Sequence, residues 1–145
     1  MPLTDQHRFG MQLAQMSRGW RAELDRRLAG LGLSQARWLV LLHLARFEDT
    51  PTQRELAQSV GVEGPTLARL LDSLEAQGLV QRLAVVEDRR AKKILLCDSA
   101  RPLIEQIETI ANALRVELFT GVDDEEMRVC MRVHQQILAN LEKKS

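Results

Sequence analysis

Arginines are the residues of this sequence whose placement best suits a defined chemistry. Arg69 stands opposite a leucine stripe in the stretch GPTLARLLDSLEA, and Arg89 and Arg90 lie within the basic run DRRAKK at residues 88–93. A guanidinium presents planar donors that suit a phosphate or the edge of guanine, and an ammonium suits a phosphate. These side chains predict recognition of a nucleic acid rather than bond-making chemistry.

The other reactive side chains follow no catalytic or metal-binding spacing. His7, His43 and His134 are far apart, without an H-x-x-H or H-E-x-x-H motif, and phosphate-binding glycine loops and the G-x-S-x-G motif are missing. Cys97 and Cys130 form no C-x-x-C pair, which favours a reducing compartment and two small buried hydrophobes over a disulfide. We therefore expect no enzyme activity, no metal and no cofactor.

The composition is that of a soluble chain with its charge unevenly spread. The 145 residues are 45% hydrophobic, enough for a core, and 20 basic side chains balance 20 acidic ones. Residues 82–93 nevertheless hold five basic and two acidic side chains, a local patch that can attract phosphate. Because no apolar run reaches membrane-spanning length and the N-terminus has no signal core, we expect one compact cytoplasmic chain.

Apolar periodicity predicts a mainly α fold with one small β-hairpin, an α+β class. Helices are expected over about 4–28, 35–46, 53–60, 62–78, 99–120 and 124–141, with Ser34 as the N-cap of the second. Thr52 and Glu55 form a capping box at the start of the third. The β-rich runs 79–86 and 92–97 flank a polar tip, EDRRA, which is typical of a hairpin.

The third and fourth predicted helices have the features of a helix-turn-helix. Ala57 is small where two helices would touch, and Gly61 suits the turn. On the fourth helix Arg69 faces away from the leucines, leaving a slim face that suits a major groove. An ordinary helical hairpin is the alternative. The basic hairpin that follows favours a winged helix, whose arginines suit a narrow minor groove, with Asp88 holding a neighbouring arginine.

Three stretches resemble the MarR family of winged-helix regulators, and its SlyA branch in particular. They are DRRAKKILL at 88–96, VEGPTLARLLDSLEAQGLVQR at 62–82 and SRGWRAELDRRLAGLGLSQARW at 17–38. The resemblance implies dimerisation helices in 1–33 and 98–145 and a DNA-binding lobe in 34–97. It also implies a homodimer on an A·T-rich pseudo-palindrome. With the helix-face argument, it places the following residues at double-stranded DNA: Thr52, Gly64, Pro65, Thr66, Arg69, Ser73, Arg82, Asp88, Arg89, Arg90 and Lys92.

The same resemblance implies a dimer interface and a ligand crevice. A short apolar seam on the last helix and the apolar side of the first place Phe9, Leu13, Met127, His134, Ile137 and Leu141 between subunits. Arg18, Arg21, Trp38 and His43 match positions that would hold a small aromatic acid, although core packing and surface charge also explain them. A winged-helix adaptor that binds protein instead of DNA is the rival function, and steep salt dependence would exclude it.

Overall fold

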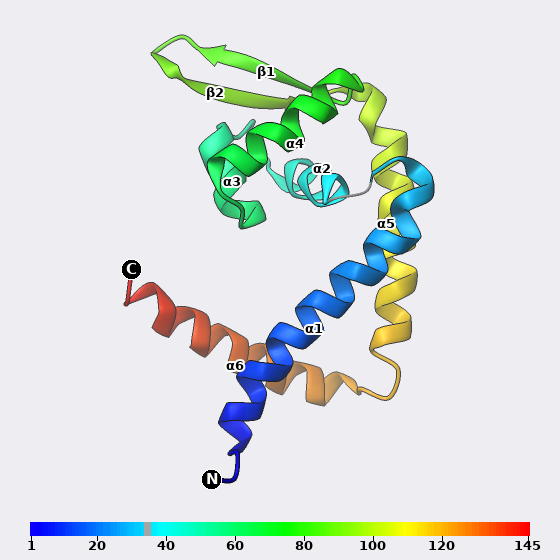
Figure 1. The fold of residues 1–145 in the computed structure, drawn as a ribbon, viewed down its shortest axis with the longest axis vertical. Coiled ribbons are helices and arrows are strands. Elements are labelled where there is room, and N and C mark those ends of the chain that lie inside the picture. The colour runs from blue at the N-terminus through cyan, green and yellow to red at the C-terminus, as the bar shows by residue number, and fades with distance from the viewer. Residues whose placement is uncertain (34–35) are drawn as a thin grey trace. The chain divides into compact units, whose positions relative to one another are not determined.

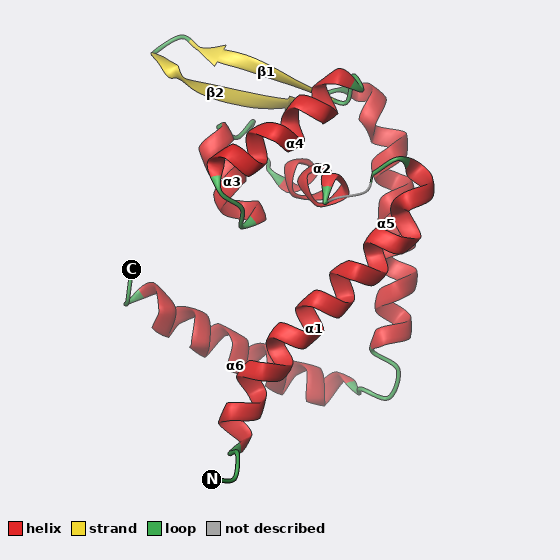
Figure 2. Cartoon of the chain, viewed as in Figure 1, coloured by secondary structure: helices red, strands yellow, loops and turns green. Residues whose placement is uncertain are grey.

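The computed structural model describes residues 1–33 and 36–145, with the side chain of Arg89 excepted. It contains two compact units, Met1–Asn112 and Ala113–Ser145 (Figure 1). The elements are α1 (Asp5–Leu28), α2 (Arg37–Arg46), α3 (Gln53–Val60), α4 (Gly64–Ala76), β1 (Val80–Val85), β2 (Asp88–Leu96), α5 (Arg101–Leu118) and α6 (Asp124–Glu142). Figure 2 shows helices in red and the two-stranded hairpin in yellow, which confirms the predicted fold class.

A leucine-rich core holds the winged-helix part of the first unit together. Its fully buried side chains come from every nearby helix and from the hairpin: Leu28, Leu33, Val40, Leu41, Leu56, Leu67, Leu71, Leu74, Val80 and Ile94. Burying one such side chain contributes roughly 1.5–3 kcal/mol relative to leaving it in water. The core therefore fixes how α2, α3 and α4 lie against one another.

Helix α2 begins later than its hydrophobic pattern predicts. Its first residue is Arg37, and Ala36 before it has a left-handed backbone with φ of 68°. An alanine there costs about 1–2 kcal/mol. Ser34, the predicted N-cap, lies outside the described residues.

The turn between α3 and α4 depends on local hydrogen bonds that the sequence predicts. The Thr52 hydroxyl accepts the N–H of Glu55 at 3.1 Å, and the Glu55 carboxylate accepts the N–H of Thr52 at 3.0 Å. At the other end of α3, Gly61 has a φ of 82°, and its N–H donates to the Ala57 carbonyl at 2.9 Å. The predicted capping box and turn glycine are both confirmed.

The second strand of the hairpin is longer, and its turn has fewer residues, than the sequence predicts. The predicted tip spans 87–91, but residues 88–91 belong to β2, so only Val86 and Glu87 form the turn. A register shift of three residues after Ala84 pairs Val85 with Asp88 instead of Ala91, which leaves only two residues in the turn. The root is fixed to the start of α3, because the Ile94 N–H donates to the Pro51 carbonyl at 2.9 Å.

The last two helices begin with different local structures. A short 3₁₀ turn, Asp98–Ala100, precedes α5, and within it the Ser99 hydroxyl donates to the Gly78 carbonyl at 2.7 Å. Helix α6 begins with a capping box between Asp123 and Glu126. None of its residues, all of which are described, is buried within the single chain. Across the described residues, no helix is long and apolar enough to cross a membrane.

Candidate nucleic-acid interface

Helix α4 presents the face that its leucine spacing predicts. Leu67, Leu71 and Leu74 have no exposed surface, whereas Arg69 and Asp72 are exposed. Because the opposite side of α4 is buried against the core, Arg69 points outward, on a surface with few large side chains. Such a face suits entry into a major groove, since only slim surfaces bring a helix close to base edges.

A second arginine flanks this face from another helix. Arg37, at the start of α2, donates from Nη1 to the Ser73 hydroxyl at 2.8 Å. Together with Thr66, Arg69 and Leu70 these residues line a hollow of about 330 Å³. Ser73 keeps its own O–H as a donor, since a hydroxyl can accept and donate at once. Sequence reasoning missed Arg37, because its position beside α4 depends on tertiary packing.

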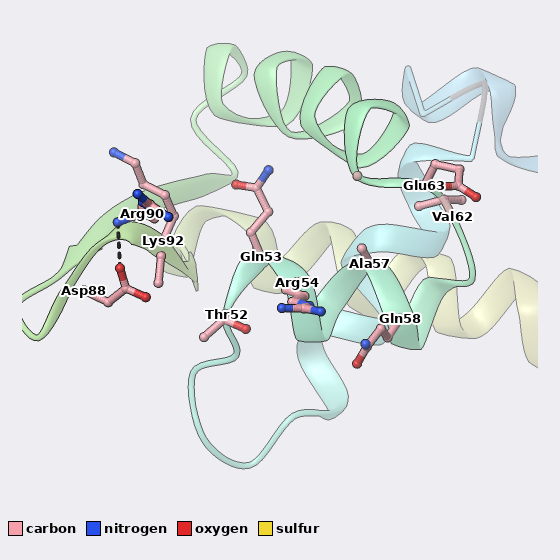
Figure 3. A pocket seen from close by; sticks show the side chains of 12 residues that line it. Thr52, Gln53, Arg54, Ala57, Gln58, Val62, Glu63, Asp88, Arg90 and Lys92 are labelled. Atoms are coloured by element: carbon pink, nitrogen blue, oxygen red, sulfur yellow. Dashed lines mark hydrogen bonds between the residues drawn. The ribbon is translucent and has the colours of Figure 1, made fainter. Parts of the chain in front are cut away.

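A larger cleft of about 830 Å³ lies between α3, the α3–α4 turn and β2 (Figure 3). It brings together predicted and unpredicted residues. The predicted ones are Thr52, Gly64, Asp88, Arg90 and Lys92, and the others are Gln53, Arg54, Ala57, Gln58, Val62, Glu63 and Ala91. Figure 3 shows Arg90 and Lys92 at the hairpin end, Gln53 and Arg54 on α3, and Glu63 at the α3–α4 turn. The cleft is therefore lined by cations from two elements.

Asp88 holds a neighbouring arginine, as expected, but it does so through the backbone. Its Oδ1 accepts the backbone N–H of Arg90 at 3.0 Å. The short side chain of aspartate favours such a bond to the backbone two residues ahead. Asp88 therefore fixes the backbone next to the hairpin turn, and the side chain of Arg90 extends exposed from it. The side chain of Arg89 lies outside the described part of the chain.

We predicted that Arg82 contacts DNA, but in the structure its side chain contacts α4. Its guanidinium binds Asp72 at 2.5 Å and Glu75 at 3.0 Å, and its backbone N–H donates to Glu75 at 3.1 Å. The bonds from the Arg82 backbone and guanidinium lower the pKa of the Glu75 carboxyl. Arg82 is thus directed at α4, and it ties the hairpin to that helix.

Comparison with known proteins identifies the type of protein that carries this interface. A model of the MarR family matches residues 31–91. The solved structure of the transcriptional regulator PA3341 is 69% identical, with a TM-score of 0.87, and the match covers 93% of this chain and 98% of that one. The chain belongs to the MarR family of transcriptional regulators.

Two more distant MarR-family structures agree over almost the whole chain. The MepR–DNA complex of S. aureus is 26% identical, with a TM-score of 0.75, and the match covers 97% of this chain and 99% of that one. A MarR-family regulator from Silicibacter pomeroyi is 25% identical, with a TM-score of 0.83 and coverage of 97% and 96%. The SlyA branch stays a prediction, as do the domain limits 1–33, 34–97 and 98–145.

The predicted effector residues of this MarR-family chain are only partly brought together. Trp38 is 3% exposed, and its indole N–H donates to the Asp25 carboxylate, so it is a core residue rather than a crevice wall. His43 is half-buried, and its Nδ1 lies 2.8 Å from the Ser59 hydroxyl. Burial lowers the pKa of His43, and the charges of Arg46 and Arg21 lower it further. Arg21 is therefore near His43, while Trp38 is not available to a ligand.

The predicted dimer residues have open surface in the single chain. Phe9, Leu13 and Leu141 are 40%, 48% and 59% exposed, His134 is exposed, and Met127 and Ile137 are half-buried. Leu138 on α6 is 61% exposed and was missed, because the expected seam takes Ile137 as the position after His134. Helices α1 and α6 therefore each expose more apolar surface than a single exposed apolar residue would account for.

The Arg82 contacts lead to a first prediction. Arg82→Gln should loosen the hairpin against α4, so DNA affinity should fall several-fold at neutral pH. The low pKa of Glu75 means that this tie contributes to stability above about pH 4.5 and is lost as the pH falls through the folded-state pKa. Thermal unfolding from pH 7 to pH 3 should therefore separate the variant from the wild type only at the higher values. Arg101→Gln, which removes an exposed local pair with Asp98, is the control and should change neither.

Proposed function

We propose that this protein is a homodimeric, sequence-specific transcriptional regulator that inserts α4 into a major groove and its hairpin into the adjacent minor groove. The cation-lined cleft between α3, α4 and β2 is the observation that carries the proposal. The preferred site is an A·T-rich pseudo-palindrome, because narrow A·T-rich minor grooves have an enhanced negative potential that attracts arginine.

The cleft is suited to the sugar-phosphate strand that separates two neighbouring grooves. A helix in a major groove and a hairpin in the next minor groove must straddle one sugar-phosphate strand. Arg54 from α3 and Arg90 and Lys92 from β2 line the space in which that strand would lie. Phosphate contacts of this kind fix the register of a protein on DNA, while base contacts supply specificity. We assign Arg54 to phosphate contact for this reason.

An adaptor that binds only protein is less consistent with these features. The centre of a protein-binding surface is rich in aromatic side chains and poor in lysine, whereas this cleft is lined by Lys92 and none of its described lining residues is aromatic. Binding to DNA releases counterions, so its affinity must fall steeply with salt. An adaptor would lack that dependence.

The exposed apolar surfaces of α1 and α6 support the homodimer. Phe9, Leu13, Ile137 and Leu141 would be covered by the same surfaces of a second copy, an isologous contact. Two winged helices related by a two-fold axis would then meet half-sites about 34–36 Å apart, one turn of DNA.

Arg18, Arg21 and His43 are the residues that would bind an effector. Arg18 and Arg21 are exposed on α1, and the charge of Arg21 reaches the half-buried His43. A small aromatic carboxylate would pair with arginine and lie against the imidazole. Trp38 is excluded from this group, since its ring is buried.

The two arginines of the DNA-facing surface should differ in their effects. Arg69→Ala should cost about 1–3 kcal/mol of binding if it contacts a base edge, and should relax preference at one position per half-site. Arg90→Ala should lose most affinity on sites with A·T-rich flanks, where the narrow groove strengthens attraction. Binding of each variant to a selected site, with and without A·T flanks over a range of salt, measures both. Unchanged affinity in two folded variants would refute these roles.

Association should be visible without DNA. We expect a dimer at micromolar concentration, and Leu141→Glu or Ile137→Glu should yield monomer or unfolded chain, because such dimers often have no stable folded monomer. Val86→Glu, at a residue that is 95% exposed in the hairpin turn, is a matched control and should stay dimeric. Sedimentation equilibrium gives the mass of each. A stable wild-type monomer would exclude the dimer.

A ligand effect is the fourth expectation. Salicylate-like compounds should weaken DNA binding by the wild type, and the effect should fade in Arg21→Ala. Arg8→Ala removes an exposed arginine of the same helix and should respond like the wild type. Calorimetry with millimolar compound checks binding directly, and a flat titration would leave Arg21 and His43 without an effector role.

A further inference from the structure

Glu63 occupies the N-cap position of α4, but its side chain forms no capping hydrogen bond. The helices α1, α3 and α6 each begin with a capping box, made by Thr4, Thr52 and Asp123. At α4 the side chain of Glu63 makes no cap bond, and it forms no hydrogen bond or ion pair with any other described residue. The carboxylate is exposed and lines the large cleft (Figure 3).

A carboxylate at this position opposes indiscriminate binding of DNA. The first N–H groups of a helix, with the partial positive charge of its N-terminus, attract phosphate of any sequence. Two charges of like sign repel, and the repulsion near a protein surface is stronger than in bulk water. A phosphate that approached the start of α4 would therefore meet Glu63, whereas Arg54, Arg90 and Lys92 elsewhere in the cleft would attract it.

The same carboxylate has a favourable partner in the major groove. Residues at the N-terminal end of a recognition helix contact base edges. Cytosine presents an N4 amino group there, and glutamate accepts from it, while guanine and thymine present acceptors that a carboxylate repels. The repulsion would then be offset only on DNA that places an amino group opposite Glu63.

We propose that Glu63 is a specificity-determining residue that accepts a hydrogen bond from a cytosine amino group in the correct half-site and repels phosphate on all other DNA. This inference rests on the proposed DNA-binding function and goes beyond it. It assigns to Glu63 a role in lowering non-specific affinity, which is opposite in sign to the role of the cleft cations. Sequence reasoning missed it, because the cleft that Glu63 lines forms only once α3 and β2 meet.

The test compares two substitutions at Glu63 with a control of equal charge. Glu63→Gln removes the repulsion, so non-specific DNA should bind more tightly, and the ratio of specific to non-specific affinity should fall by roughly tenfold or more. Glu63→Asp keeps the charge and shortens the reach, so only specific binding should weaken. Glu105→Gln changes the charge equally at an exposed position of α5, outside the residues that line the cleft, and should preserve the ratio.

The readouts are affinity for a selected site, affinity for unrelated DNA, and base preference by selection from random sequence. Loss of a cytosine preference at one position of the half-site in Glu63→Gln supports the inference. An unchanged affinity ratio in Glu63→Gln, or an equal change in Glu105→Gln, overturns it while wild-type DNA binding stands. A wild type that shows no salt-dependent DNA binding instead overturns the proposed function and, with it, this inference.

Discussion

The burial of one side of α4 is the constraint on which the rest of the interface depends. Leu67, Leu71 and Leu74 are fully enclosed, and because a helix repeats every 3.6 residues, their burial leaves Arg69 no direction but outward. Exposing any of the three to turn the helix would forfeit roughly 1.5–3 kcal/mol. The orientation of the exposed surface of α4, Arg69 included, is therefore set by the core.

Ionic and backbone contacts then place the hairpin relative to α4. Arg82 reaches Asp72 and Glu75 on the helix, while Ile94 bonds to Pro51 at the start of α3. Each contact joins the strands to a different helix. Helix α4 and the hairpin are thus held in one fixed arrangement, as the proposed simultaneous contact with two grooves would require.

Features set by near neighbours could be predicted from the sequence, and features set by distant partners could not. Leucine spacing gave α4 its correct face, and the Thr52 box and Gly61 turn depend on residues three or four positions away. Arg82 and Trp38 were assigned to ligands because their types suit DNA and aromatic acids. Their actual partners, Asp72 and Asp25, are 10 and 13 residues away, and nothing in the local spacing reveals them. The cleft residues Arg54 and Glu63 were missed for the same reason, since the cleft exists only once α3 and β2 meet.

The hairpin is attached to the start of α3 at Ile94, so a small rotation there moves its turn much further. From Ile94 to Asp88 the strand extends about 20 Å, so a rotation of about 5° at the root carries the tip through about 2 Å. A displacement of that size separates a hydrogen-bonded pair from one that is out of reach. Small angular changes where β2 meets Pro51 are therefore magnified at Arg90, so the position of the hairpin turn is most sensitive to structure at the opposite end of the strands.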